Sequence, residues 1–166
     1  RTIIGNPNPD FVYGINLELS YKNLSLRVLA NGVYGNDIAN GNLLQLATPE
    51  GISWSNITTA AYNNAWRPER TSNSYPRIGY TTNGQIAMPD WIIEDGSFLR
   101  ISNINLSYQF DRINIYLSAQ NLFTFTGYSG YNPEVTSFLY DGLRNGVDWN
   151  GQPSARKFTI GLNFNL

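Results

Sequence analysis

The sequence contains no cysteine and no histidine. The lack of cysteine excludes disulfide bonds and thiolate chemistry, and the lack of histidine removes the commonest metal ligand and the commonest general base. Charged residues make up only 14 % of the chain, against roughly 25 % in soluble domains. The net charge is -1 without any basic run, so a nucleic-acid-binding surface has no electrostatic support. We therefore expect neither an enzyme nor a nucleic-acid partner, and we predict no cofactor.

Long apolar runs are absent as well. No stretch approaches about 18 consecutive apolar residues, so the sequence predicts no transmembrane helix. The first residues have neither the apolar segment nor the small-residue cleavage site of a signal peptide, and a mature start and an internal fragment would both look like this. Neither absence argues against a membrane β-barrel, because barrel strands carry a much weaker sequence signal.

What the sequence has instead is aromatic residues, at 14 %, and neutral polar residues, chiefly Asn, Ser, Thr and Gly. Apolar and polar residues alternate over five segments, which is the period of a β-strand. Residues 22–23 and 111–112 form two short turns between such segments. Tyr21 and Leu24, which flank the first turn, both belong to the apolar set, as they must if they share a face of the hairpin, and the second hairpin behaves likewise. The predicted strands are residues 11–21, 24–35, 98–110, 113–125 and 156–166.

Long segments without this alternation separate the hairpins, and we predict them as loops over residues 1–10, 36–97 and 126–155. Loops above about 12–15 residues are uncommon in compact soluble domains. Short turns at one end and long loops at the other are typical of outer-membrane barrels, whose long loops are extracellular. The predicted fold class is therefore all-β: the C-terminal strands of a large antiparallel transmembrane β-barrel. Residues 1–166 would form one fragment of it, because a barrel needs about eight strands.

The two faces of the predicted strands differ in a way that favours lipid on one side. The polar face carries few charges, which fits a crowded lumen better than the outer face of a soluble sandwich, and aromatic residues gather near the strand ends as in a membrane girdle. Arg100 and Arg156 share the parity of the apolar face, at the loop-side starts of their strands, where we expect them above the hydrocarbon. The predicted lipid-facing band is Ile15, Leu17, Leu19, Leu26, Val28, Ile104, Leu106, Ile115, Leu117, Ile160 and Leu162. The predicted aromatic girdle is Phe11, Tyr13, Tyr21, Tyr34, Tyr108, Phe110, Phe123, Phe158 and Phe164.

Two segments resemble the SusC/RagA family of TonB-dependent outer-membrane transporters. Residues 93–104, IEDGSFLRISNI, are similar to the family's EDGSFLRLKNI segment. Residues 118–134, SAQNLFTFTGYSGYNPE, are similar to its SAQNLFTFTGYSGYDPE segment, with Asn132 where Asp is commoner. Residues 146–162 resemble the closing GxD…YP…RTFTLGLN strand, and parts of the segment 66–77 resemble the family's long loop, so the resemblance spans essentially the whole chain.

The resemblance implies a barrel of about 22 strands with an N-terminal plug, of which this chain supplies the last five strands. It implies a location in the outer membrane of Bacteroidetes, with the C-terminus periplasmic, and active import of glycans or peptides. The implied partners are outer-membrane lipid, a SusD-like surface lipoprotein, TonB acting through the missing N-terminal part, and a second copy in a dimer of transporter pairs. A soluble all-β carbohydrate-binding module stays open as the alternative.

Aromatic residues in or beside the long loops are the candidate contacts to substrate or lipoprotein, because aromatic faces stack on sugar rings and anchor protein partners. Packing within the loops is the alternative role for each. Glu94 and Asp95 are not predicted to share a proton, since adjacent strand residues point to opposite faces. The stretch from Asp141 to Asn150 favours a turn over a Ca²⁺ site, because its spacing does not match the EF-hand. The candidate contacts are Trp54, Trp66, Trp91, Tyr128, Tyr131, Tyr140 and Trp149, with no catalytic or metal-binding residue.

Overall fold

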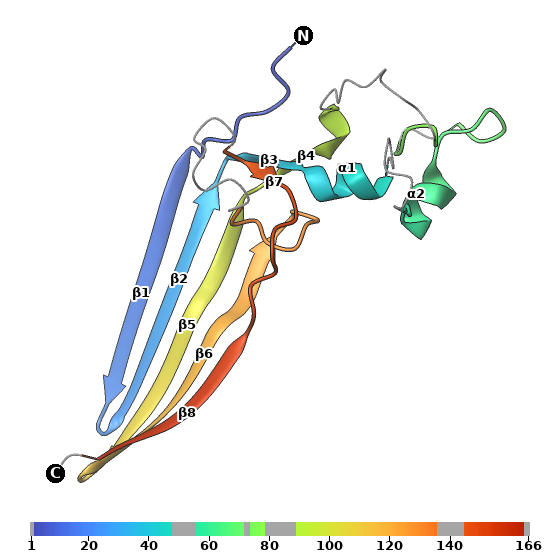
Figure 1. Cartoon of the computed structure of the whole chain (residues 1–166). Helices are drawn as coiled ribbons and strands as arrows, with labels where there is room; N and C mark the ends of the chain where they lie inside the picture. Colours follow the sequence, from blue (N-terminus) through green and yellow to red (C-terminus); the bar gives the residue numbers. More distant parts are fainter. Residues whose placement is uncertain (1, 48–55, 72–73, 79–88, 136–144, 165–166) are drawn as a thin grey trace.

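The computed structural model describes residues 2–47, 56–71, 74–78, 89–135 and 145–164. Its main element is a long five-stranded antiparallel sheet with the strand order β1-β2-β5-β6-β8 (Figure 1). The predicted all-β antiparallel class is confirmed, and β2 and β6 end within one residue of the predicted positions. The strands are β1 (Phe11–Tyr21), β2 (Leu24–Tyr34), β5 (Phe98–Phe110), β6 (Ile113–Thr126) and β8 (Lys157–Phe164).

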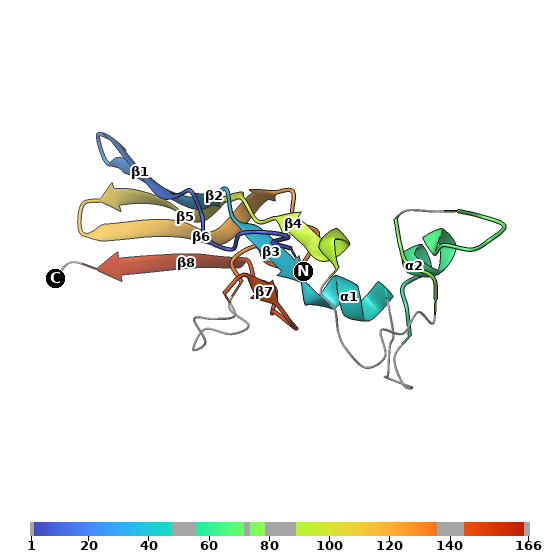
Figure 2. The same cartoon turned by 90° about the horizontal axis from the view of Figure 1, so that it is seen from above.

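Short elements gather at the end of the main sheet opposite the tight turns (Figures 1 and 2). The sequence shows most of these residues only as loops, because helices of 7 and 6 residues are too short to display a helical period. Among the described residues, the helices all fall short of the length and apolar character that crossing a membrane requires. The elements are a small sheet of order β4 (Ile93–Asp95), β3 (Asp37–Asn40) and β7 (Val147–Asp148), the helices α1 (Gly41–Ala47) and α2 (Thr59–Asn64), and the 3-10 helix η1 (Asp90–Ile92).

The register of the main sheet places the apolar residues of all five strands in common rows. One row runs through Leu19, Leu26, Leu106, Leu117 and Ile160, because each of these residues is the direct partner of the next. Direct partners in an antiparallel pair lie on the same face of the sheet. By the same register, every residue of the predicted band and girdle lies on this face, which we call the apolar face.

The apolar face is open over most of its extent. Ile160 is 77 % exposed and Leu162 is 56 % exposed, and the exposed large apolar side chains of β1 on this face range from 46 % at Leu17 to 71 % at Tyr21. Phe158 pairs with Ala119 and so belongs to the row that contains Leu17. It therefore lies at the same height in the sheet as aliphatic residues, although it is near the loop-side start of β8. Within the described residues, the small sheet and the helices lie at the end of the main sheet rather than over this face (Figure 2).

Two irregularities interrupt the rows at one level of the sheet. β5 carries one extra residue relative to β2, at Ser102, and β6 carries one relative to β5, beside Asn121, whose φ is +51°. An extra residue reverses the face that the following residues occupy. Arg100 therefore pairs with Asn31 and Thr124 on the polar face. The expectation that Arg100 shares the apolar face is wrong, because a strict period-two pattern does not allow for the extra residue of a bulge.

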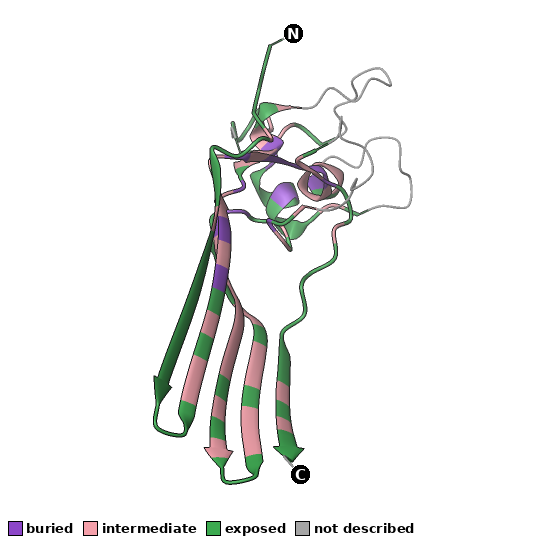
Figure 3. Ribbon diagram, turned by 90° about the vertical axis from the view of Figure 1, so that its left-hand side faces the viewer, coloured by how far each residue is buried: buried purple, intermediate pink, exposed green. Residues whose placement is uncertain are grey.

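Full burial is concentrated at the loop-side end of the molecule (Figure 3). Ile38 of β3 and Ile92 of η1 are both 0 % exposed and form the centre of a small core there. Along the main strands the side chains are mostly exposed or half-buried, and Arg156, just before β8, is exposed. The loop-side end thus has a packed interior of its own, whereas the main sheet is a single layer in the described part of the chain.

One tyrosine links three strands on the apolar face. The hydroxyl of Tyr13 in β1 donates a hydrogen bond of 3.0 Å to the carbonyl oxygen of Phe98 in β5. The ring reaches β5 by lying across Gly32 of β2, its direct partner. A Cβ at Gly32 would lie 2.4 Å from the Tyr13 ring and 2.3 Å from the Phe98 carbonyl oxygen. The glycine therefore leaves the space through which the ring crosses the middle strand.

We expect Gly32→Ala to lower the free energy of unfolding by about 1–3 kcal/mol, because the new methyl group must displace either the ring or a strand carbonyl. The matched control is Gly14→Ala, whose Cβ would have its nearest neighbour at 3.9 Å. The measurement is the midpoint of thermal unfolding of the full-length protein that contains this chain. Equal midpoints for the two variants would contradict the packing role of Gly32.

Candidate functional site

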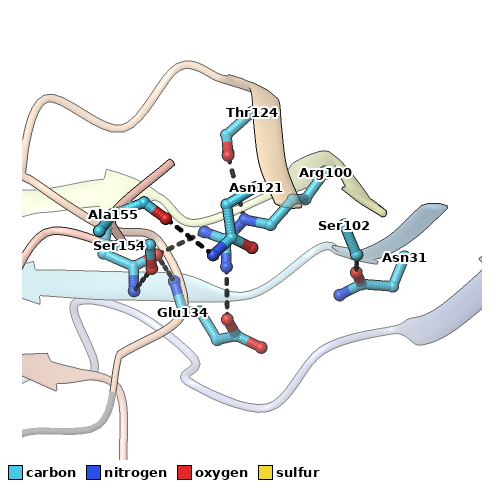
Figure 4. Close-up of polar contacts among 9 residues, drawn as sticks. Asn31, Arg100, Ser102, Asn121, Thr124, Glu134, Ser154 and Ala155 are labelled. Carbon is cyan, nitrogen blue, oxygen red and sulfur yellow. Dashed lines mark hydrogen bonds and ion pairs between the residues drawn. The ribbon is translucent and has the colours of Figure 1, made fainter. Parts of the chain in front are cut away.

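A buried arginine fixes the segment that follows β6. Arg100 is 5 % exposed, and its Nη1 lies 2.5 Å from a carboxylate oxygen of Glu134. Its Nη2 donates to Asn132 Oδ1 at 2.6 Å, and its Nε donates to Thr124 Oγ1 at 3.0 Å (Figure 4). Each of the three guanidinium nitrogens therefore has an oxygen partner, which offsets the cost of removing the charge from water.

The same cluster reaches the segment that leads into β8. Asn132 Nδ2 donates to Ser154 Oγ at 3.1 Å, and Asn121 Nδ2 donates to the carbonyl oxygen of Ala155 at 3.2 Å (Figure 4). Asn121 is the residue with positive φ at the bulge, a conformation that asparagine tolerates better than most residues. The extra residue at Ser102 of β5 thus turns Arg100 to the polar face, and the extra residue beside Asn121 of β6 presents an amide to the neighbouring segment.

A second cluster is organised by Glu94 of β4. Its carboxylate accepts hydrogen bonds from the backbone N–H of Ser129 at 2.7 Å, from the Ser129 hydroxyl at 2.8 Å and from Asn40 Nδ2 at 2.9 Å. Asn40 is 2 % exposed, and its Oδ1 accepts from the N–H of Leu43 in the first turn of α1 at 2.9 Å. Asp95 instead accepts from the N–H of Ser97 at 2.8 Å, so the two adjacent carboxylates have separate partners.

A third contact joins two of the most buried polar groups. The hydroxyl of Tyr128 donates to Asp148 Oδ2 at 2.7 Å, and Asp148 Oδ1 accepts from the N–H of Gly151 at 3.1 Å. Tyr128 is 5 % exposed and Asp148 is 2 % exposed. Burial, the hydrogen bond to Asp148 and the charges of Asp148 and Glu94 together raise the pKa of Tyr128 well above its ordinary value. The hydroxyl therefore stays protonated and acts as a fixed donor.

These contacts hold the loops in place and engage the buried carboxylates of the site. The carboxylates of Glu94 and Asp148 accept hydrogen bonds from groups of the protein itself. In the part of the chain that the structure describes, no three Asp or Glu side chains are grouped so that they could hold a metal ion. The loop-side end is thus built as a rigid surface of polar and aromatic side chains, which suits binding.

The candidate aromatic residues fall into two groups. Tyr128 is buried against Asp148, Trp149 is the next residue after Asp148 and is 40 % exposed, and Tyr131, which is 71 % exposed, borders a hollow together with Gly151. Trp66 and Trp91 are half-buried elsewhere, and Trp91 makes an edge contact with Tyr75 at 6.2 Å between ring centres, as packing within the loops would require. Trp54 and Tyr140 lie outside the described residues.

Reasoning from the sequence missed the polar residues that organise the site: Glu94, Arg100 and Glu134. Their side chains meet groups that are 24 to 54 positions away in the chain, so no local spacing connects them. One signal was present, because all three lie within the two segments, 93–104 and 118–134, that carry the strongest family resemblance. In a single sequence such a residue appears only as part of a motif, because its distant partner cannot be identified.

We expect Arg100→Met to free residues 127–135, because Glu134, Asn132 and Thr124 would all lose a charged partner. Losing one member of a buried charge pair costs about 3–5 kcal/mol, less here because Glu134 is half exposed. The control is Arg27→Met, whose ion pair with Glu18 is more than half exposed on both sides and is worth about 0–1 kcal/mol. Hydrogen exchange of residues 127–135 should rise at least tenfold in the first variant only; unchanged exchange there would count against the anchoring role.

We expect Tyr128→Phe to destabilise the loop-side end by about 1–3 kcal/mol at neutral pH, because Asp148 loses a donor while buried. The raised pKa of Tyr128 sets the pH dependence. The folded protein keeps this proton above pH ~10, where an unfolded tyrosine releases it, so the stabilisation is complete below pH ~10 and declines as the pH rises. Thermal unfolding at pH 7, 9 and 11 should therefore show a difference between the wild type and the variant that narrows only at the highest pH; a constant difference would contradict the assignment.

Comparisons with known proteins agree with the architecture. No family model matches the chain. TonB-dependent receptor P3 of Formosa agariphila is 33 % identical over 177 residues, a match that covers 98 % of this chain and 17 % of the receptor. TonB-dependent receptor SusC of Bacteroides thetaiotaomicron is 30 % identical over 177 residues, covering 98 % of this chain and 16 % of SusC. The chain thus spans about a sixth of the length of the curated relatives that it matches.

Solved structures show the same fold. The RagAB peptide importer in its closed-closed state superposes with a TM-score of 0.77 at 24 % identity, over 98 % of this chain and 18 % of the matched chain. The structure of the RagAB peptide transporter superposes with a TM-score of 0.72 at 25 % identity, over 91 % and 17 %. Over the length that it spans, the chain is therefore a SusC/RagA-like segment of the TonB-dependent receptor type.

Proposed function

We propose that this chain forms the C-terminal part of the wall, together with outer loops, of a TonB-dependent importer in the bacterial outer membrane. The single observation that carries the proposal is the apolar face of the main sheet, which is continuous across five strands and largely exposed. Large contiguous apolar surfaces on soluble monomers are rare and mark contact with a partner or a membrane. Alternation of apolar and polar faces along every strand is the pattern of a membrane barrel.

The polar face supports a lumen on the other side. Its partners along the strands are mostly neutral, such as Ser20 with Ser25 and Gln109 with Asn114, and the pair of Glu18 with Arg27 is an ion pair. A soluble β-sandwich needs a second sheet over the apolar face. Because the small sheet of the described residues stands at the end of the main sheet instead, the carbohydrate-binding sandwich has no supporting observation (Figure 1).

The open edges of the sheet support further strands. β1 and β8 are each paired on one side only in the described structure. Unpaired backbone N–H and C=O groups are costly in a hydrocarbon environment, so membrane sheets close into barrels. We infer that other parts of a longer protein pair with both edges and supply the plug through which TonB would act.

The orientation follows from the asymmetry of the connections. The turns at residues 22–23 and 111–112 would be periplasmic, and Phe164 of β8, which pairs with Ile113 beside the second turn, would bring the C-terminus to the same side. The loop-side end would then be extracellular, where its rigid aromatic and polar surface would meet a glycan or peptide substrate and a SusD-like surface lipoprotein. The importer would assemble as a dimer of such transporter pairs.

A pair of lysine substitutions tests the lipid-facing assignment. We expect Leu106→Lys to lower the stability of the full-length protein in bilayers by about 2–4 kcal/mol, because it places a charge on the lipid face. The control is Ser107→Lys, the next residue, which lines a polar hollow of about 440 Å³ on the opposite face and should change stability little. The measurement heats samples to a series of temperatures before electrophoresis and records the temperature at which the band of the folded form disappears. A lower temperature for Ser107→Lys than for Leu106→Lys would overturn the proposed faces.

Import itself is tested in the host. We expect the full-length protein to fractionate with the outer membrane together with a surface lipoprotein, and deletion of its gene to abolish growth on one class of polymeric nutrient. Deletion of tonB should abolish the same growth. Recovery of the protein in a soluble fraction, or growth that is independent of tonB, would refute the proposal.

A further inference from the structure

Tyr116 of β6 and Gly161 of β8 are direct partners at one edge of the main sheet. They lie on the polar face, because the adjacent pair of Leu117 with Ile160 lies on the apolar face and successive side chains of a strand alternate. A Cβ added at Gly161 would lie less than 3.0 Å from Cζ, Cε1 and the hydroxyl oxygen of Tyr116. The hydroxyl-bearing end of the ring therefore lies over the backbone of β8.

The ring leans toward the edge of the sheet although a hydroxyl group lies on its inner side. Ser107 of β5 is the other direct partner of Tyr116, and a serine hydroxyl can both donate to a phenol and accept from it. The Tyr116 hydroxyl nevertheless makes no hydrogen bond to any residue in the described ranges. It is thus placed over the last strand of the described sheet without a partner.

The same arrangement occurs inside the sheet, where the hydroxyl does have a partner. Tyr13 of β1 lies over Gly32 of β2, also with Cζ and the hydroxyl oxygen close to the glycine. From there the hydroxyl donates a hydrogen bond of 3.0 Å to the carbonyl oxygen of Phe98 in β5, the strand beyond the glycine. Phe98 precedes Leu99, which is the direct partner of Gly32. A tyrosine that crosses a glycine in this sheet can therefore reach the backbone of the third strand.

Beyond Gly161 the third strand is missing from the described structure. β8 pairs with β6 alone, so the outer N–H and C=O groups of β8 have no strand partner among the described residues. Glycine weakens a strand because it has no side chain to pack, and an aromatic ring from the neighbouring strand can cover the gap. Such cover accounts for the ring of Tyr116 but gives its hydroxyl no role, since phenylalanine would cover the glycine equally well.

We propose that the Tyr116 hydroxyl donates a hydrogen bond across Gly161 to a backbone carbonyl oxygen of the strand that pairs with the outer edge of β8. This strand belongs to the same barrel, lies outside residues 1–166 and runs antiparallel to β8, as neighbouring strands of outer-membrane barrels do. The chain spans about a sixth of the length of its curated relatives, so a longer protein has room for such a strand.

The geometry of Tyr13 also indicates which carbonyl accepts. By analogy with Phe98, the acceptor belongs to the residue next to the direct partner of Gly161. The bond lies on the polar face, so it would join the two strands on the side of the lumen. The proposal rests on the importer function proposed above, whose barrel it joins at a named residue.

The partner strand can be identified by photochemical cross-linking in the full-length protein, folded in outer membranes. Tyr116 is replaced by benzoylphenylalanine, whose ketone lies near the position of the hydroxyl and reacts with neighbouring C–H bonds on irradiation. We expect a cross-link within one polypeptide to a barrel strand outside residues 1–166, mapped by mass spectrometry. The same replacement at Tyr13 is the positive control, because it should cross-link to β5 near Phe98.

Three results of this experiment would overturn the proposal. They are a cross-link from position 116 to a second protein molecule, cross-links only to residues within 1–166, and no cross-link while the probe at position 13 reacts. Import keeps its own readout in growth that depends on tonB, so the importer proposal can stand when the bond across Gly161 fails.

Removal of the hydroxyl alone separates the hydrogen bond from the cover of the glycine. Tyr116→Phe keeps the ring over Gly161, and we expect amide hydrogen exchange in residues 157–164 of the full-length protein to rise about fivefold, the factor for one lost hydrogen bond of ordinary strength. Tyr13→Phe makes the same atomic change at the bond to Phe98 and should accelerate exchange in β5 but not in β8. Unchanged exchange of β8 in Tyr116→Phe would leave Tyr116 only the covering role.

Discussion

The antiparallel hydrogen-bond ladder from β1 to β8 determines which side chains share a face, and the remaining features of the molecule follow from that register. Because direct partners lie on the same side, a single apolar row such as the one from Leu19 to Ile160 fixes the position of every other row. A slip of one residue in any strand would move that strand's apolar side chains to the polar face. The tight turns and the Tyr13 contact across Gly32 both act against such a slip.

The lower part of the sheet could be predicted from the sequence, because two simple rules govern it there. Strict alternation and two-residue turns determine the pairing of Tyr21 with Leu24 and of Phe110 with Ile113, and both pairs occur. The local sequence contains no signal for the extra residue at Ser102, so Arg100 was predicted to lie on the wrong face of the sheet. Bulges are chosen by the tertiary contacts that they permit, which a period-two pattern does not contain.

The loop-side end was less predictable for a related reason. Its helices are short, and its order depends on polar contacts between residues far apart in the chain, such as Glu94 with Ser129. Reasoning from residue type named Tyr131, Trp149 and Tyr128 alike as candidate contacts to substrate or lipoprotein. The structure exposes Tyr131 and Trp149 but buries Tyr128 against Asp148. Aromatic residues serve packing and recognition equally well, and only the surrounding structure decides between the two.

The alternation that builds the apolar face also keeps the unfolded chain polar along its length. In the single chain each apolar residue of a strand is flanked mainly by polar ones, so a continuous apolar surface does not exist before strands pair. The apolar face arises only when neighbouring strands pair and the separate apolar residues come together. Under the proposed function, the same pairing that gives the sheet its shape would therefore also create the surface that contacts the membrane.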